Sequence, residues 1–227
     1  MSSFTNFYET WFEQLHHLVR QLAAAPRPPT TPDHRCDLDH LVTKVMSHYA
    51  EYYEVKSVAA ERDAVAVFAA PWATSLERSL HWIAGWRPTT AFHLVYSESS
   101  ILFESHITDI FRGLRTGDLG DLSPSQFRRV SELQCETVRE ENAITEEFSE
   151  WQDSASELVN VCADLDEKIE RLVSVLRKAD DLRLRTLQSV VDFLTPQQAV
   201  EFFIAAAELQ FGVRASGINH DRQRENL

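Results

Sequence analysis

Apolar side chains recur every three or four residues along most of this chain, a spacing that places them on one face of a helix. Residues 4–25 and 37–60 follow the pattern closely, and two stretches at 61–69 and 89–112 continue it. The pattern predicts an all-α fold in which about seven or eight helices pack into a single bundle.

Two further helix starts are marked by a proline behind a capping residue. Ser123-Pro124-x-Gln126 and Thr195-Pro196-x-Gln198 each place a hydroxyl before the proline and a glutamine at the third helical position. No glycine or proline lies between the two prolines, so this segment is predicted to form one or two long helices with a break near residues 152–156. One apolar stripe marks its second half: Leu158, Cys162, Leu165, Ile169, Leu172, Leu176, Ala179, Leu187, Val190 and Leu194.

Residues 71–96 hold three of the five tryptophans and one of the six glycines. Thr74-x-x-Glu77 is a capping box, whose hydroxyl and carboxylate satisfy the free amides at a helix start. Leu76, Leu80 and Ile83 follow at helical spacing. Gly85 permits a close approach of two backbones and Pro88 begins a new helix. The stretch therefore predicts a buried helical hairpin around which the other helices pack.

The chain divides into four parts by composition. Residues 1–25 form an amphipathic N-terminal helix, and residues 26–36 form a linker that holds four of the eight prolines. Because proline favours extended backbone, the linker should let the first helix dock at the periphery of the bundle. Residues 37–214 form the bundle, with a last helix at about 196–212 that Gly212 and Gly217 end. Residues 215–227 are predicted to be a disordered tail.

Composition narrows the class of protein. The 44% of apolar and 25% of charged residues are typical of a globular domain, and six glycines are too few for a protein with many tight turns. A net charge of −13, only four lysines and no basic run argue against direct nucleic-acid binding. Three scattered cysteines indicate a reducing compartment. No membrane span or secretory signal is evident, so the nucleus and cytoplasm are the expected locations.

No constellation of residues predicts catalysis, a metal or a cofactor. His40 and His48, like His81 and His93, are too far apart in sequence for a local chelate. Cys135 lacks a second cysteine at metal or redox spacing. The acidic run at residues 136–153 is typical of a solvated helix face rather than of a carboxylate pair across a cleft. Within residues 180–192, acidic residues lie next to basic ones such as Arg183, a pattern that favours ion pairs between helices over phosphate binding.

Three segments resemble the plant Delay of Germination domain family. They are P-W-A-T-S-L-E-R-S-L-H-W-I-A-G-W-R-P at residues 71–88, the pair of blocks at 178–187 and 194–199, and residues 41–53. In this family the domain occurs alone in seed-dormancy regulators, and beside a basic zipper in the TGA transcription factors. This chain is similar to the stand-alone form. The resemblance implies a non-enzymatic regulator of dormancy and hormone signalling that binds other proteins.

The resemblance also implies a partner-binding site in the first helix. Dormancy regulators of the family use an N-terminal Tyr-x-x-Trp segment to bind and inhibit clade A type 2C protein phosphatases, including those of abscisic acid signalling. Tyr8-Glu9-Thr10-Trp11 is similar to that segment, and Phe12 and Leu15 extend the same apolar face. Two interpretations stay open: these side chains dock a partner, or they pack on the bundle.

Other functions remain alternatives. The chain could act as a transcriptional regulator together with TGA-type zipper factors, or carry a lipid or porphyrin between its helices, and a homodimer is compatible with each. Some members of the family carry a histidine pair suited to haem in the last helix. Here Gln210 and Arg214 stand at those positions, and because neither is a good iron ligand, no haem is expected there.

Overall fold

The computed structural model describes residues 3–154 and 164–225, and these fold into helices without a strand. The helices are α1 (Ser3–Ala24), α2 (Pro32–Arg62), α3 (Ala64–Ala69), α4 (Ser75–Ser79), α5 (Thr89–Ser105), α6 (Ile107–Phe111), α7 (Pro124–Asp153), α8 (Asp164–Phe193) and α9 (Pro196–Glu225), with one 3-10 turn, η1 (Leu119–Asp121). The predicted single all-α bundle is confirmed, with nine α-helices in the described part of the chain. Leu158 and Cys162 of the predicted stripe lie outside the described residues.

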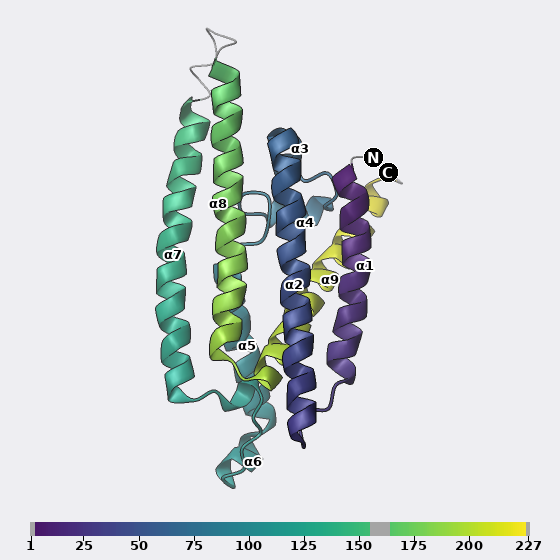
Figure 1. Cartoon of the computed structure of the whole chain (residues 1–227), viewed down its shortest axis with the longest axis vertical. Helices are drawn as coiled ribbons and strands as arrows, with labels where there is room; N and C mark the ends of the chain where they lie inside the picture. Colours follow the sequence, from purple (N-terminus) through teal and green to yellow (C-terminus); the bar gives the residue numbers. More distant parts are fainter. Residues whose placement is uncertain (1–2, 155–163, 226–227) are drawn as a thin grey trace.

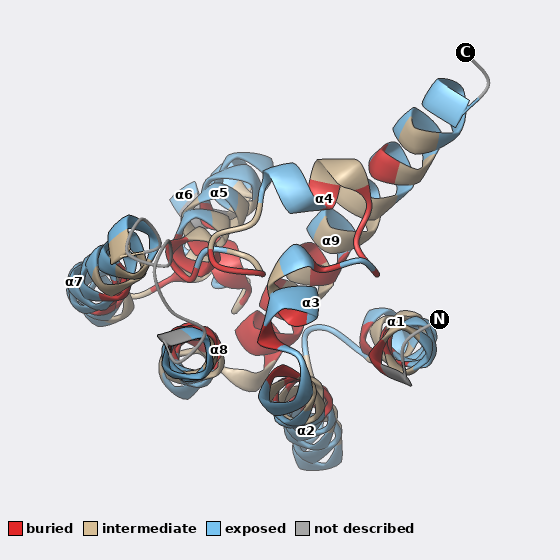
Figure 2. Ribbon diagram, turned by 90° about the horizontal axis from the view of Figure 1, so that it is seen from above, coloured by how far each residue is buried: buried red, intermediate tan, exposed pale blue. Residues whose placement is uncertain are grey.

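Four long helices run side by side along the long axis of the molecule (Figure 1). α7 packs on α8, α8 on α2 and α2 on α1, while α9 crosses behind this row and contacts α1, α2, α4 and α5. Seen from above, α1 lies at the edge of the bundle, and buried residues face inward from each helix (Figure 2). None of the described helices is apolar over a length that could cross a membrane.

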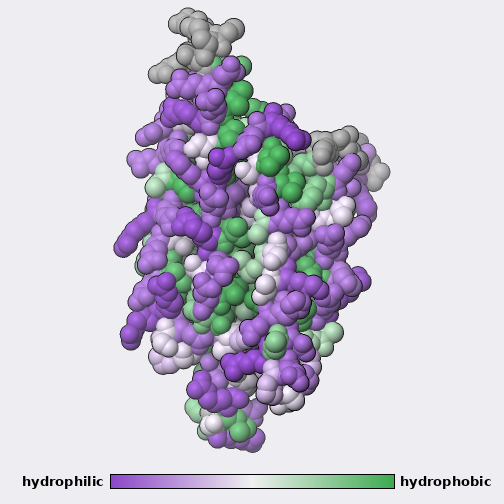
Figure 3. Space-filling view, viewed as in Figure 1, coloured by the Kyte–Doolittle hydropathy of each residue, from purple (hydrophilic) through white to green (hydrophobic). Residues whose placement is uncertain are grey.

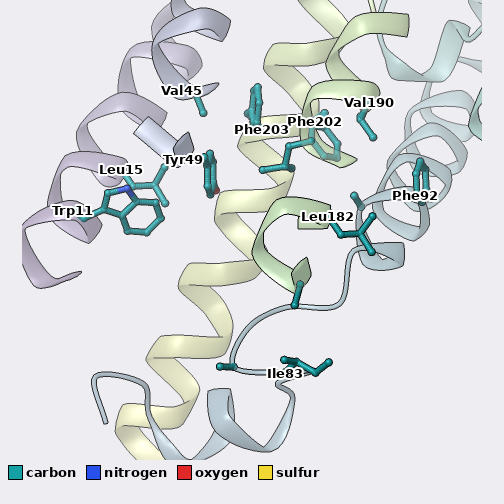
Figure 4. Packing of buried hydrophobic residues seen from close by; sticks show 14 of the residues in the cluster. Trp11, Leu15, Val45, Tyr49, Ile83, Phe92, Leu182, Val190, Phe202 and Phe203 are labelled. Carbon is teal, nitrogen blue, oxygen red and sulfur yellow. The ribbon is translucent and has the colours of Figure 1, made fainter. Parts of the chain in front are cut away.

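The core is one continuous apolar cluster that α9 joins to the row of long helices (Figure 4). Phe202 and Phe203 of α9 lie between Tyr49 of α2 and the apolar side chains of α8, and all are buried. Each fully buried large apolar side chain stabilises the fold by about 1.5–3 kcal/mol relative to an exposed one. α9 therefore adds an apolar layer behind a row in which α2 and α8 already pack directly on each other.

The predicted capping devices form, and two of them meet. Gln126 N–H donates to Ser123 Oγ at 3.2 Å, and Ser123 N–H donates to Gln126 Oε1 at 2.9 Å. Thr195 and Gln198 repeat the arrangement at the start of α9. Gln126 Nε2 then donates to Gln198 Oε1 at 2.7 Å, which ties the start of α7 to the start of α9.

Two helix ends differ from the prediction. α2 begins at Pro32 rather than at residue 37, because Thr31 Oγ1 accepts from His34 N–H and a proline is favoured at the first helical position. The linker is correspondingly shorter. α9 passes through both predicted stop glycines and continues to Glu225, so the prediction of a disordered tail is wrong for residues 215–225, and residues 226–227 lie outside the described part of the chain.

The predicted hairpin at residues 71–96 is also wrong in its first arm. α4 has its capping box, but it ends at Ser79 after five residues, and Leu80 is 59% exposed. Residues 80–88 then form a non-helical loop before α5 begins. Between α6 and α7, residues 113–122 contain η1, whose Leu119 is fully buried.

Candidate functional site: the docked N-terminal helix and the charged core

The aromatic face of α1 is covered by the protein itself. Tyr8, Trp11 and Leu15, all three predicted to bind a partner, are 5%, 2% and 0% exposed against α2 and α9. Phe12 lies at the edge of the same face, half-buried, with its ring 5.2 Å from that of Phe211. The structure thus brings the four predicted residues together on one helix and packs them on the bundle.

Trp11 is held on α2 by a reciprocal contact with His48. Trp11 Nε1 donates to the His48 carbonyl oxygen at 2.9 Å, and His48 Nε2 donates to the Trp11 carbonyl oxygen at 3.0 Å. The two rings are stacked, with centroids 4.8 Å apart and planes 3° from parallel. Burial lowers the pKa of His48, against the opposing effects of the Trp11 carbonyl and Glu51. Burial of the ring therefore favours the neutral imidazole, against the effect of this hydrogen bond.

Arg214 of α9 binds the other side of the same face. Its guanidinium lies over the rings of Tyr8 and Phe12, 5.0 Å and 4.9 Å from their centroids, where a cation is attracted to the ring. The same group pairs with Glu77 at 3.3 Å, and Glu77 closes the capping box of α4. Burial raises the pKa of Tyr8 to about 12. Arg214, one of the two positions considered for haem ligands, thus connects α1 to α4.

A cluster of buried charges occupies the bundle beside α1. Lys56 Nζ of α2 donates to Asp180 Oδ1 of α8 at 2.9 Å, and Arg183 Nη1 donates to the same oxygen at 2.5 Å. These side chains are 1%, 7% and 0% exposed. Burial lowers the pKa of Lys56 to about 8, while Asp180 opposes that shift. The predicted pairing between helices is confirmed for Asp180, which pairs with Lys56 of α2, and for Arg185, which pairs with Glu140 of α7 at 2.6 Å. Arg183 pairs with Asp180 inside α8, and the participation of Lys56 was not predicted.

The remaining donors of this charged core hold the loop at residues 80–88. Lys56 Nζ donates to the Ala84 carbonyl at 2.9 Å, and Arg183 Nε donates to the Trp86 carbonyl at 2.7 Å. Arg183 Nη2 donates to the carbonyls of Ile83 and Trp82. A helix would use these carbonyls internally, so the charged side chains explain why α4 stops early.

The backbone of this loop is bent by the same contacts. Ile83 and Ala84 have φ values of 47° and 57°, the left-handed region that non-glycine residues seldom adopt. At Gly85, a Cβ atom would lie 2.8 Å from Arg183 Cζ. The glycine is therefore required for the approach of the guanidinium, a different reason from the helix packing that the sequence predicted.

A buried carboxylate starts the helix that follows the loop. Glu141 is fully buried, accepts from Thr89 N–H at 2.6 Å, and accepts from Arg87 Nε at 2.8 Å. The prediction that the acidic run at 136–153 forms a solvated face is wrong at this residue. Glu141 lies on the apolar stripe of α7 and satisfies the free amide at the start of α5.

The described residues include no group of histidine, cysteine, aspartate or glutamate side chains that could hold a metal ion. One open groove of about 430 Å³ lies between α1 and α2, lined partly by His17, Lys44 and Glu51. The chemistry that the site offers is therefore the packing of an aromatic helix and the fixing of a loop by buried charges.

These features define a class of helical protein in which an aromatic N-terminal helix packs on a bundle whose buried charges hold an internal loop. The family model described as "Seed dormancy control" matches residues 14–97, which run from α1 through this loop into α5. Protein DOG1-like 2 of Arabidopsis thaliana is 31% identical over 82% of this chain and 77% of its own length. The chain belongs to the DOG1-like family.

Further relatives extend the match over nearly the whole chain. Protein DOG1-like 3 of Arabidopsis thaliana is 28% identical over 96% of this chain and 84% of that protein. Transcription factor TGA7 of Arabidopsis thaliana is 25% identical over 95% of this chain but only 55% of its own length. The chain is thus similar to one part of a longer transcription factor as well as to the stand-alone proteins.

Proposed function

We propose that this protein is a non-enzymatic regulator that acts by binding another protein through α1. The proposed partner is a clade A type 2C protein phosphatase, in keeping with Tyr8-x-x-Trp11, and the proposed process is the control of seed dormancy in the nucleus and cytoplasm. Membership of a family described by seed dormancy control supports the regulatory role. Because Tyr8 and Trp11 are buried, binding through them requires α1 to leave its own bundle.

The main observation behind this proposal is that α1 is an aromatic helix that already packs in a groove of the same chain. It packs on α2 and α9, and residues 25–31 connect it to α2. An amphipathic helix in an apolar groove is a common mode of recognition between proteins. A partner with a matching groove would compete with α2 and α9 for the same side chains.

The competition has a definite cost. Five apolar side chains of α1 are buried: Phe4, Tyr8, Trp11, Leu15 and Leu22. At about 1.5–3 kcal/mol for each, their exposure opposes release by roughly 10 kcal/mol, less the entropy that the freed helix and linker regain. A partner must cover most of this face again, so we expect an exchange of one groove for another.

Variants on the two sides of the contact separate this mechanism from simple packing. Trp11→Ala removes an anchor from α1, so we expect weaker binding to a purified clade A type 2C phosphatase. His48→Ala leaves α1 unchanged but weakens its own groove, so exchange predicts that phosphatase binding becomes several-fold tighter. The measurements are calorimetric affinity and inhibition of phosphatase activity.

Val130→Ala is the matched control, because Val130 is fully buried on α7, away from the contact of α1 with α2 and α9. It should destabilise the bundle without changing affinity. Weaker binding by His48→Ala would contradict exchange. An affinity unchanged by Trp11→Ala, with near-UV circular dichroism showing a native bundle, would exclude α1 as the binding element.

A reversible cross-link tests whether α1 must move. The rings of His16 on α1 and Phe211 on α9 are stacked 3.6 Å apart, so cysteines at these two positions should be within reach of a short thiol-reactive cross-linker that reduction cleaves, in a background with the three native cysteines replaced by serine. We expect the cross-linked protein to lose phosphatase binding and the protein with the linker cleaved to regain it. Equal binding in both states would show that α1 stays docked.

A second candidate is joint action with TGA-type transcription factors, which the match to TGA7 over 95% of this chain favours. Capture experiments with the full chain distinguish the two. Recovery of zipper proteins by wild type and by Trp11→Ala alike, without a phosphatase, would favour transcriptional regulation through the bundle.

A further inference from the structure

The connection between α1 and α2 is an accessible stretch that stays outside the core. Leu22 is the last buried residue of α1 and Leu38 the first of α2, and residues 23–37 between them are exposed or half-buried. The stretch lies at the lower end of the molecule, where α1 ends and α2 begins (Figure 1), and hydrophilic or intermediate atoms cover most of that corner of the surface (Figure 3). An enzyme can therefore bind this backbone, including the first turn of α2, without exposing an apolar core residue.

Within this stretch, Pro29-Thr30-Thr31-Pro32 has the pattern of a proline-directed phosphorylation site. Pro32 follows Thr31 directly, which is the feature that proline-directed serine/threonine kinases require, and Pro29 stands two positions before Thr31, where these kinases favour a second proline. Proline favours the extended backbone in which a kinase binds its substrate. Thr31 already has such a backbone, with φ of −133° and ψ of 158°.

The structure distinguishes Thr31 from the other two hydroxyl residues that precede a proline, Ser123 and Thr195. Ser123 directly follows the buried Leu122 and is itself half-buried, and Thr195 lies three residues before the buried Gln198. A kinase that bound the chain at either position would have to separate packed helices. Thr31 is exposed, and so are the residues on both sides of it.

A phosphate on Thr31 would form where the chain already offers donors to an anion. Thr31 is the N-cap of α2, and its Oγ1 accepts from His34 N–H at 3.1 Å. A phosphate adds a charge of about −1.5 to −2 and three acceptor oxygens, and negative charge is stabilised at the start of a helix. Within four residues of Thr31 there are two arginines, Arg27 and Arg35, and one carboxylate, Asp33. The local charge therefore also favours the phosphorylated form.

From these observations we propose that Thr31 is a phosphorylation site for a proline-directed protein kinase, and that the phosphate caps the start of α2. The γ-phosphoryl group of ATP is transferred to Thr31 Oγ1 as its bond to ADP breaks, and the hydroxyl proton passes to the catalytic aspartate of the kinase. The inference holds whether or not α1 binds a phosphatase, so it does not depend on the proposed function.

Incubation of the full chain with a purified, activated mitogen-activated protein kinase and Mg-ATP tests the site. Intact mass should show one added phosphate, which fragmentation assigns to Thr31. Thr31→Ala should lose the phosphate, and Pro32→Ala should lower kcat/KM at least tenfold. Thr30→Ala is the matched control, because Thr30 is equally exposed but is not followed by proline, and it should be phosphorylated like wild type. Absence of transfer to wild type, or transfer that persists in Thr31→Ala, overturns the proposal.

Phosphorus NMR of the phosphorylated chain tests the cap. A phosphate held at the start of α2 is stabilised as the dianion, so its second pKa should be lower in the folded protein than in the same protein unfolded in urea, where it should be about 6. Amide exchange at residues 33–37 should also be several-fold slower than in the unmodified chain. A phosphate that titrates equally in both states, with exchange at these residues unchanged, overturns the capping role.

Discussion

At the scale of single residues, three buried charges determine the shape of the loop at residues 80–88. Lys56, Asp180 and Arg183 form a cluster with one net positive charge, and the loop carbonyls accept the remaining donors. Removing one partner from a buried ion pair typically costs about 3–5 kcal/mol, because the other charge stays uncompensated. The unusual backbone of the loop is therefore stabilised by side chains that lie far from it in sequence.

Gly85→Ala tests this arrangement with a single methyl group. The added Cβ would lie 2.8 Å from Arg183 Cζ and 3.0 Å from its Nε, so the guanidinium must move away from the loop carbonyls. We expect the free energy of unfolding in urea to fall by about 1–3 kcal/mol, as for other overpacked sites.

The control is the same substitution on α9. Gly212 is helical, and no atom lies within 4 Å of its Cβ position, so Gly212→Ala should raise the free energy of unfolding by about 0.5–1 kcal/mol. Two variants with equal stability would contradict the proposed role of Gly85.

Residues whose partners are close in sequence were predicted well, and those with distant partners were not. The capping boxes at Thr74 and Ser123 depend on a residue three positions away, and both form. By contrast, Lys56 and Asp180 pair although they are 124 positions apart in sequence, and Glu141 accepts from the Thr89 amide 52 positions away. Neither contact was predicted. A charged residue in an apolar stripe was the available signal for Glu141, but periodicity alone does not identify its partner.

At the scale of elements, α9 shows why a helix end is hard to predict from glycines. A glycine that breaks an isolated helix is tolerated where packing needs the space. Gly217 is buried, and a Cβ there would collide with the Thr74 side chain. The last turns of α9 therefore lie directly against the start of α4, and what sequence analysis predicted as a tail is part of the structure.

Asp221 gives this contact a direct test. Its carboxylate accepts from Ser75 N–H at 3.0 Å and from Ser75 Oγ, and these hydrogen bonds lower its pKa. Asp221→Ala should lower the thermal midpoint and speed hydrogen exchange in α4. Gln223→Ala, at an exposed position two residues further along α9, should change neither. Equal exchange in α4 for both variants would show that α9 does not support that helix.

The same reasoning applies to α1. Periodicity correctly predicted a peripheral amphipathic helix and grouped Tyr8, Trp11, Phe12 and Leu15 on one face. Periodicity cannot distinguish a face that packs on its own bundle from one that binds a partner, because both require the same apolar side chains. The groove that covers them is made by α2 and α9, and the contact with Arg214 spans almost the whole sequence.

At the scale of the whole molecule, the bundle and α1 should open separately. The charged core ties α2 to α8, whereas α1 is joined to the bundle along one face and by a short linker. Proteins commonly open in cooperative units of differing stability. The release of α1 is therefore expected at a lower free energy than the unfolding of α2 and α8.

The pH dependence of that release follows from His48. Burial under α1 lowers its pKa, and release of α1 would return it to about 6.5. A histidine whose pKa is lowered in the docked state binds a proton more readily when α1 is released. The free energy that holds α1 in place is therefore greatest above pH 6.5 and falls as the pH drops below that value. The pKa of His16 is also lowered, by burial and by the nearby charge of Arg20, so its protonation at low pH weakens docking in the same way.

Hydrogen exchange resolved by segment measures this difference. Between pH 7.5 and pH 5.5, we expect protection factors, corrected for intrinsic rates, to fall several-fold more in α1 than in α8. In His48→Asn, which can still donate to the Trp11 carbonyl but does not titrate, the fall in α1 should be smaller. His17→Asn is the matched control, since His17 is exposed on α1, and it should behave like wild type. If α1 and α8 lost protection in parallel, the chain would open as one unit, and a partner could reach Trp11 only by unfolding the bundle.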